Sequence, residues 1–459
     1  MGTVRFCPVF RNKKRDKNVP SPLSLPGVGD QHEVDVEETR GNVDSTISRI
    51  RLYDEIEKEY ILSCQEQGVQ FAQPPNPRKR LKRIQHLAKK GALVRNKAAS
   101  VSINAISDAC IACTGGSGSK TFFLSLQCNR NCYFCFNPNQ QDFEKHLSQI
   151  NDLEKELNEL VQQGRHMTHI ALTGGEPLLH PKETIRFFAS VQDHYPGIHT
   201  RLYTSGDLLD DDLLEQLHNV CLTEIRFSVK LDDAEELQKR TLENIRRACG
   251  SIPQVMVEMP VIPGTEKEMR ALLRELDAIG IFGINLLEFC FPRHNWEEFE
   301  QRGFRVKNPP FPVLYNYGYA GGLPIAGSDE LALALVEFAL EEKLAMGVHY
   351  CSLENKHRDE IYQANMRFAQ RLPCYDLDRE DFFLKSIVVF GDDVAKVRNA
   401  ANRRGAIPFE EDPEDHSLQF HPQFLPNLRH VDAQFYTSYN VIEYHEGESY
   451  VRELKLELC

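Results

Sequence analysis

The chain lacks any run of about 20 consecutive apolar residues, the length needed to span a bilayer. Its first residues also lack the apolar region of a secretory signal. Both absences predict a soluble, cytoplasmic protein with no membrane partner. Positive charge is also in the minority: the chain has 54 Lys and Arg residues against 67 Asp and Glu residues, which gives a formal net charge of −13. This balance excludes an overall electrostatic footprint for nucleic acid, although a local basic patch can sit on an acidic protein.

Cysteine, by contrast, is abundant, with 13 residues in a chain of 459. In a small secreted domain such a count indicates disulfides, but clustered cysteines in a large chain without a signal more often bind metal. We therefore expect reduced thiols. Because single cores seldom exceed about 250–300 residues, we expect three segments. These are a polar and helical N-terminal extension at 1–105, a main domain at 106–300 and a C-terminal region at 301–459 with a β-rich tail.

Short β-branched or aromatic runs alternate with helical periodicity in the middle of the chain, which is typical of parallel strands joined by crossover helices. The strands are expected at Thr121–Leu126, His169–Thr173, His199–Thr204, Glu224–Lys230, Gln254–Val261 and Asn285–Phe289. The intervening helices are expected at Phe143–Val161, Glu183–Asp193, Asp210–His218, Ala234–Ala248 and Glu266–Ile279. Right-handed crossovers would curl six such strands into an open, partial barrel with its site at the C-terminal strand ends.

Helices and strands are also expected outside this repeat. Helices are predicted at 48–67, after the basic run Arg78–Arg83 and after Ser328, and tail strands at 386–390, 435–439 and 450–458. A charge run of this kind is usually a solvated face, and contact with RNA is the functional alternative.

The most informative motif is Cys128-Asn-Arg-Asn-Cys132-Tyr-Phe-Cys135, directly after the first expected strand. Three thiolates at this spacing can occupy three corners of an iron–sulfur cubane and leave the fourth iron free to bind a small molecule. A zinc site completed by a distant fourth ligand is the alternative.

A second motif, Gly174-Gly175-Glu176-Pro177, ends the next expected strand. Its glycines allow close backbone approach and Glu176 could take an ammonium group, so the turn is suited to holding an amino acid.

In these two motifs the chain resembles the radical S-adenosylmethionine (SAM) enzymes, and the resemblance covers residues 109–374. Within them it is most similar to an uncharacterised group related to pyruvate formate-lyase activating enzymes. That closer similarity rests on the segments Cys110-Ile-Ala-Cys113-Thr-Gly-Gly, Asn285–Phe289, Arg302–Phe304 and His349–Ser352. The implied fold is α/β, a partial (β/α)6 radical SAM barrel with a helical N-terminal extension and a smaller C-terminal α+β region.

The resemblance implies a [4Fe–4S] cluster on Cys128, Cys132 and Cys135 whose unique iron binds the amino and carboxylate groups of SAM. Reductive cleavage of SAM would yield methionine and a 5′-deoxyadenosyl radical that abstracts hydrogen from a substrate. A peptide or protein substrate is expected, and a one-electron reductant such as flavodoxin or ferredoxin.

By position, the resemblance also implies a set of SAM contacts. Phe134 would lie against adenine, and Glu176 with its neighbours Gly174, Gly175 and Pro177 near the methionine ammonium. Ser205, between Thr204 and Gly206, would lie near ribose or carboxylate, Ser228 and Lys230 would face into the barrel, and Val261 and Ile262 would pack on adenine. Ser228 and Lys230 have a structural alternative, because strand ends often carry polar residues merely to meet water.

The remaining cysteines suggest further roles. Cys110 and Cys113 form half of a closed metal site, and Cys351 and Cys374 are the expected partners because both follow the barrel strands in polar, helix-flanking sequence. An auxiliary [4Fe–4S] cluster is expected there, with zinc as the alternative. Cys290 follows the sixth strand and could donate hydrogen to a substrate radical, although a free cysteine also serves as a small buried hydrophobe.

The leading function is therefore a radical SAM enzyme with an auxiliary metal site. Three alternatives stay open: a glycyl-radical activating enzyme, an RNA-modifying radical SAM enzyme that uses the basic run to position phosphates, and a non-catalytic, zinc-stabilised binding module.

Overall fold

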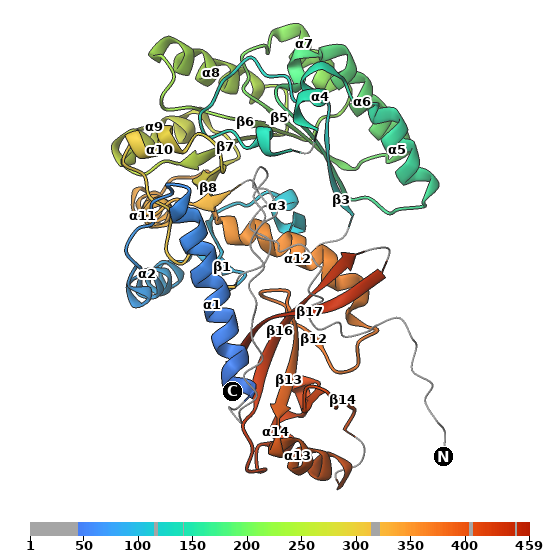
Figure 1. The fold of residues 1–459 in the computed structure, drawn as a ribbon. Helices are drawn as coiled ribbons and strands as arrows, with labels where there is room; N and C mark the ends of the chain where they lie inside the picture. Colours follow the sequence, from blue (N-terminus) through green and yellow to red (C-terminus); the bar gives the residue numbers. More distant parts are fainter. Residues whose placement is uncertain (1–44, 114–117, 141, 314–321, 404–406, 446–447) are drawn as a thin grey trace. The chain divides into compact units, whose positions relative to one another are not determined.

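The computed structural model describes residues 45–113, 118–140, 142–313, 322–403, 407–445 and 448–459 (Figure 1). The chain divides into two compact units. In the described residues, the larger unit comprises 69–310 and 322–357, and the smaller one comprises 45–68, 311–313 and 358–459. Neither unit is a continuous stretch of sequence, and the larger one takes strands from all three expected segments.

The larger unit is built on a nine-stranded sheet with the order β1-β2-β11-β8-β7-β6-β5-β4-β3. Strands β3 to β8 are parallel neighbours, which confirms the expected partial barrel. Their bounds are Ser119–Phe123, His169–Thr173, His199–Thr204, Glu224–Phe227, Gln254–Val261 and Gly283–Glu288.

Three strands that the sequence did not predict extend this sheet beyond β8. Strand β11 (Gly347–Cys351) pairs in parallel with β8, β2 (Ser100–Ile103) pairs antiparallel with β11, and β1 (Leu93–Arg95) pairs antiparallel with β2. Cys351 lies after the six predicted barrel strands and before α12 (Leu353–Ala369), as expected, but it ends the additional strand β11.

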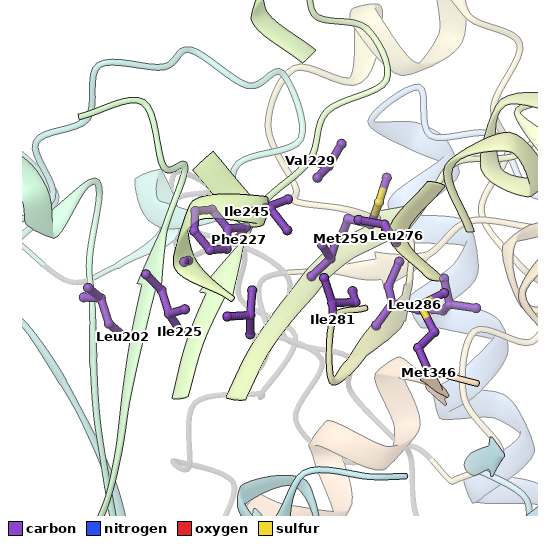
Figure 2. Close-up of a cluster of buried hydrophobic side chains, with 14 of the residues drawn as sticks. Leu202, Ile225, Phe227, Val229, Ile245, Met259, Leu276, Ile281, Leu286 and Met346 are labelled. Carbon is purple, nitrogen blue, oxygen red and sulfur yellow. The ribbon is translucent and has the colours of Figure 1, made fainter. Parts of the chain in front are cut away.

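Helices cover the outer face of the parallel strands: α5 (Leu153–Gln162), α6 (Pro181–His194), α7 (Asp211–Asn219), α8 (Glu235–Ala248), α9 (Glu266–Ile279) and α11 (Ser328–Glu342). Each carries an apolar stripe, and every second residue of a strand faces it. Leu202, Ile225, Phe227 and Leu286 of the sheet share one buried core with helix residues such as Ile245 (Figure 2). Full burial of one such side chain stabilises a fold by roughly 1.5–3 kcal/mol, so this core fixes which strand residues face the opposite, inner side.

The helix expected at Phe143–Val161 is in fact two helices, α4 (Phe143–Ser148) and α5, so this prediction was wrong. The chain leaves the helical path because Asn151 bonds to the end of β3, from its backbone N to the O of Leu124 at 2.8 Å and from Nδ2 to the O of Phe123 at 2.9 Å. Asp152 then caps α5 by accepting from the N of Lys155.

The basic run lies on α2 (Pro77–Lys89), and part of it is paired within the larger unit. Arg80 Nε lies 3.4 Å from Asp329, and Arg83 Nη2 lies 3.4 Å from Glu337, both on α11. These contacts leave fewer of its charges for phosphates.

The smaller unit contains a six-stranded antiparallel sheet, as expected for the C-terminal α+β region. Its strands are β12 (Asp376–Leu377), β13 (Leu384–Phe390), β14 (Phe409–Asp412), β15 (Ser417–Phe420), β16 (Tyr436–His445) and β17 (Glu448–Leu458). Its helices are α1 (Ser45–Glu66), α13 (Asp392–Arg403), α14 (Leu425–Leu428) and most of α12 (Leu353–Ala369), which begins in the larger unit. No helix in the described part of the chain is long and apolar enough to cross a membrane.

Short elements complete the larger unit: α3 (Asp108–Cys113), α10 (Trp296–Gln301), β9 (Cys290–Phe291), β10 (Leu323–Pro324) and 3-10 turns at Asn137–Asn139 and Pro177–Leu179. Of these, α3 and β9 carry cysteines singled out in the sequence.

Candidate functional site

The three cysteines of the first motif lie on one loop that follows β3, at the C-terminal ends of the parallel strands. A turn closes this loop, with the N of Cys135 donating to the O of Cys132 at 3.0 Å. Burial raises the pKa of the Cys128 and Cys135 thiols, while the nearby ammonium of Lys230 acts in the opposite direction. The structure thus brings Lys230 to the cysteine loop. We refer to residues 128–135 as the cysteine loop.

The glycines of the second motif hold the chain that enters the cysteine loop. The N of Gly175 donates to the O of Ser125 at 2.9 Å, and the N of Glu176 donates to the O of Gln127 at 2.7 Å. A Cβ atom at Gly174 would lie 2.2 Å from the O of Ser125, and one at Gly175 only 1.8 Å from the O of Gln127. The close backbone approach expected here is therefore made to the chain itself, and any residue larger than glycine would displace the loop.

Glu176 is buried, and its carboxylate fastens the end of β5. Oε1 accepts from the N of Leu178 at 3.1 Å and from Oγ1 of Thr204 at 2.7 Å. Oε2 accepts from both the N and the Oγ of Ser205, each at 2.7 Å. An ionised carboxylate offers about four lone-pair sites, so all are used in this structure. A contact with the ammonium of SAM stays a prediction, and it would have to replace one of these bonds.

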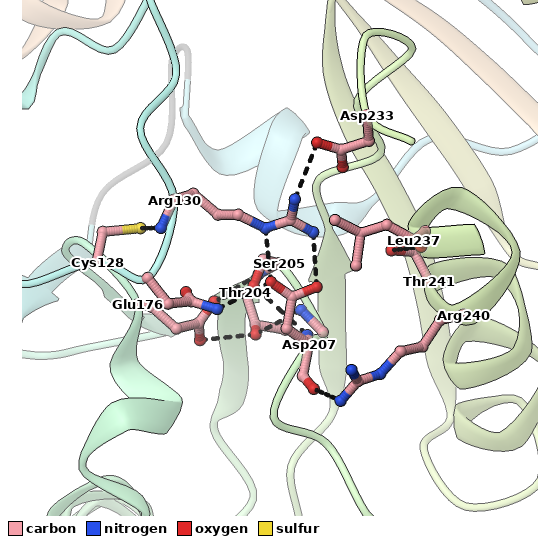
Figure 3. A network of polar contacts seen from close by, with 12 residues as sticks. Cys128, Arg130, Glu176, Thr204, Ser205, Asp207, Asp233, Leu237, Arg240 and Thr241 are labelled. Atoms are coloured by element: carbon pink, nitrogen blue, oxygen red, sulfur yellow. Dashed lines mark hydrogen bonds and ion pairs between the residues drawn. The ribbon is translucent and has the colours of Figure 1, made fainter. Parts of the chain in front are cut away.

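A half-buried arginine of the cysteine loop, not recognised in the sequence, fixes that loop to the ends of two other strands (Figure 3). Arg130 holds both carboxylate oxygens of Asp207, which follows β5, at 2.6 and 2.7 Å. Its Nη1 also donates to Asp233, beyond β6, at 2.9 Å. Asn129 and Arg240 add bonds to Asp207 at 2.9 and 2.6 Å. The one available signal was a basic residue between two metal-ligand cysteines, because its acidic partners lie far away in sequence.

The other predicted SAM contacts lie at strand ends around the same loop. Ser228 directly follows β6 and its N donates to the O of Thr204 at 3.0 Å, while Ile262 directly follows β7. The Phe134 ring packs against Tyr133 and Phe289, at 5.0 and 5.8 Å between centroids. Contacts of these residues with SAM stay predictions.

Cys290 lies in β9, which pairs with β10. Burial raises the pKa of its thiol to about 11. The sulfur is therefore protonated at neutral pH, a condition that a hydrogen donor must meet.

The cysteines of the expected auxiliary site are not all brought together. Cys110, on α3, faces the inner side of the sheet and accepts from Arg226 Nη2 and Asn285 Nδ2, each at 3.2 Å. Burial acts to raise the pKa of this thiol, but Arg226 and His349 outweigh it and lower the value to about 6. Cys351 lies within electrostatic range of Cys110. The fourth expected ligand, Cys374, is buried in the smaller unit.

The donor set of the cysteine loop fits an iron–sulfur cluster. Its three thiols are free of disulfides, and cysteine thiolates are the usual ligands of iron–sulfur clusters. In the described residues no three His, Cys, Asp or Glu side chains are arranged to hold a single metal ion. A cubane does not need that arrangement, because each thiolate binds a different iron.

Comparison with known proteins gives the family of this site. The family model described as the radical SAM superfamily matches residues 123–276. A protein of Methanocaldococcus jannaschii described as "Putative glycyl-radical enzyme activating enzyme" is 26% identical over 294 residues, which cover 62% of this chain and 74% of that protein.

Two solved structures are similar at low identity. SuiB of Streptococcus suis bound to S-adenosylmethionine matches with a TM-score of 0.37 and 12% identity, over 51% of this chain and half of SuiB. The enzyme anSMEcpe, with bound AdoMet and the Cp18Cys peptide, matches with a TM-score of 0.32 and 15% identity, over 42% of this chain and 63% of that one. Both scores are too low to bear on function. From the match of the family model, with the cysteine loop and the Gly-Gly-Glu-Pro turn inside it, residues 123–276 of this chain are a radical SAM domain.

Proposed function

We propose that this protein is a radical SAM enzyme that cleaves SAM reductively at a [4Fe–4S] cluster held by Cys128, Cys132 and Cys135. The observation that carries the proposal is the cysteine loop itself, fixed at the C-terminal strand ends of the barrel by Gly175, Glu176 and Arg130. When bound, the cluster and SAM would supply a 5′-deoxyadenosyl radical for hydrogen abstraction.

The chain's own residues would bind and orient SAM. Glu176 holds Thr204 and Ser205 at the place where the ends of β4 and β5 meet the cysteine loop. The positive charge of Lys230 acts to lower the pKa of Cys128 and Cys135 against the larger effect of burial, and it would favour an anionic group of a bound cofactor. Phe134 and Ile262 would offer apolar surface to adenine.

The name of the archaeal relative supports glycyl-radical enzyme activation as the specific reaction, so a protein substrate with a backbone hydrogen to remove is the first one to try. A flavodoxin or ferredoxin would supply the electron. An RNA substrate has less support, because Arg80 and Arg83 are paired with acidic residues of α11.

The test is anaerobic reconstitution with iron and sulfide, followed by an assay for 5′-deoxyadenosine with a strong one-electron reductant. Replacing Cys128, Cys132 and Cys135 by alanine should abolish the product, and replacing the exposed Cys221 should not. Continued 5′-deoxyadenosine formation by the triple variant would overturn the proposal. A colourless, zinc-containing wild-type protein would favour the binding module instead.

We also propose that Cys110, Cys113 and Cys351 hold an auxiliary metal, either a second [4Fe–4S] cluster or zinc. Cys374 lies in the smaller unit, and its role as a fourth ligand stays a prediction. The placement of Cys110 and Cys351 within electrostatic range of each other supports it. Replacing Cys110 and Cys113 should then remove about four irons per chain, and loss of one zinc would indicate the zinc alternative. No loss of either metal would contradict an auxiliary site.

A further inference from the structure

The inner side of the sheet is polar and stays partly accessible near the strand ends. Tyr203 on β5, Glu258 on β7 and Cys351 on β11 are half-buried, although the residues just before each of them are buried. Outer-facing residues such as Leu202 belong to the apolar core. The accessible side chains therefore alternate with the core and lie on the inner side.

One inner arginine is fully compensated. Arg226 on β6 pairs with Glu224 through Nε and with Glu258 through Nη1, and its Nη2 donates to the sulfur of Cys110. Each of its three nitrogens thus has a partner, and the two carboxylates balance its charge. Arg226 is a structural element of this surface.

A second inner arginine lies opposite Glu224 on the adjacent strand and acts electrostatically on Glu224 and Glu258, but its guanidinium forms no hydrogen bond with a described residue. Arg201 on β5 is only 7% exposed, and its Nε has no hydrogen-bond partner in the described part of the chain. It makes no ion pair there either, and its guanidinium carbon lies 5.0 Å from the centre of the Tyr203 ring. Buried charges are normally paired, because an unpaired one loses hydration without compensation. The guanidinium of Arg201 therefore keeps hydrogen-bond donors free for an acceptor outside the described residues.

A third basic residue acts on the same surface. Lys356, in the first turn of α12, acts electrostatically on Glu258, Cys351 and Cys290. No residue in the described ranges forms an ion pair with it. With Arg201 and Arg226, three cations lie near Glu224, Glu258 and Cys110, whose pKa of about 6 makes it a thiolate at neutral pH.

We propose that the inner side of the partial barrel binds a carboxylate group of the substrate, with Arg201 as its main partner and Lys356 as a second positive charge. A single negative charge fits best, because a phosphate would bring about two charges close to Glu224 and Glu258. The planar fork of a guanidinium also matches a carboxylate. That the bound carboxylate belongs to the substrate rests on the proposed function, whereas the existence of the carboxylate site does not.

The test measures binding without turnover. The full chain is reconstituted anaerobically and saturated with SAM, so that the carboxylate of SAM is already in place. Binding of 3,3,3-trifluoropropionate is then followed by ¹⁹F NMR, with the neutral 3,3,3-trifluoropropionamide as the matched probe. The carboxylate should bind and the amide should not.

Arg201→Gln should weaken carboxylate binding by about tenfold or more, since a charge-assisted bond to an ion is lost. Lys356→Met should weaken it less, and it provides a second measurement at a side chain that forms no ion pair with a described residue. Arg247→Gln is the matched control, because Arg247 pairs with Asp211 on exposed helices. Arg247→Gln should bind like the wild type.

Equal binding of acid and amide, or unchanged binding in both Arg201→Gln and Lys356→Met, would overturn the proposal. Stronger competition by inorganic phosphate than by propionate would overturn the choice of carboxylate. Competition by a hexapeptide with a free C-terminus, but not by its amidated form, would indicate that the bound carboxylate belongs to a peptide. Competition by propionate alone would indicate that it belongs to a small acid. Because no reductant is present, failure of SAM cleavage leaves this measurement unaffected, and the two proposals fail separately.

Discussion

Removing the Arg130 side chain tests whether the cysteine loop depends on its clamp to β5 and β6. The guanidinium makes two bonds to Asp207 and one to Asp233, and these three side chains are only 12%, 9% and 16% exposed. Burial acts to raise the pKa of Asp207, but the bonds from Arg130 outweigh it and keep the pKa below its usual value, so the pair is ionised at neutral pH.

Breaking a buried ion pair from one side costs roughly 3–5 kcal/mol, and a fully exposed pair contributes about 0–1 kcal/mol. For this partly exposed pair we take about 2 kcal/mol for Arg130→Gln. At 1.36 kcal/mol per tenfold change, opening of the loop should become about 30-fold more frequent.

Hydrogen exchange of the backbone amides in residues 128–136 measures this opening directly and needs no metal. Amides of β7, far along the sheet, should exchange as in the wild type. Arg247→Gln again serves as the control, since its pair is 39% and 86% exposed. Exchange in Arg130→Gln within twofold of the wild type would show that the clamp does not hold the loop.

Three further changes test other parts of the site. Gly175→Ala should prevent cluster incorporation, because its Cβ would lie 1.8 Å from a backbone oxygen. In the control Gly250→Ala, the added Cβ meets nothing closer than 3.5 Å, so this variant should bind the cluster normally. Iron content after reconstitution distinguishes the two variants. Glu176→Gln should raise the dissociation constant of SAM in equilibrium dialysis by about tenfold. The NH₂ group of the new amide would face hydrogen-bond donors, and leaving one of these donors unpaired costs roughly 1–3 kcal/mol. Unchanged affinity would exclude a role of Glu176 in SAM binding. Burial raises the pKa of Cys290 to about 11, so its thiol should resist iodoacetamide at pH 8 and react as the pH rises through 11. The exposed Cys221 should be modified already at pH 8. Peptide mass spectrometry distinguishes the two cysteines.

The sequence predicted the parallel core well, because its strands show a periodic pattern. Strands β4, β5 and β7 begin and end at the expected residues, since each carries outward core residues bounded by turns. The periodic pattern missed the helix break at residues 149–152. The hydrogen bonds of Asn151 to β3 that cause the break are tertiary contacts, and they leave no trace in local periodicity.

The candidate site was predictable only where its residues are adjacent in sequence. The cysteine loop and the Gly-Gly-Glu-Pro turn are contiguous motifs, so their chemistry could be read directly. Arg130 pairs with residues 77 and 103 positions away, and no local pattern joins them. For the same reason the unpaired Arg201 could not be recognised, because its lack of a partner is a property of the folded sheet.

The pairing of β2 with β11 has a consequence for the order in which the protein folds. These strands lie roughly 250 residues apart in sequence, and β11 is also the parallel neighbour of β8. At about 5–20 residues per second, a ribosome needs roughly 12–50 s to make the intervening chain. During that time β2 has no sheet to join, and once β8 (ending at Glu288) is made its edge stays open until β11 (beginning at Gly347) follows. The nascent chain is therefore exposed to intermolecular strand pairing. Truncations that end before residue 347 should therefore aggregate, even though they contain residues 123–276, which match the radical SAM model.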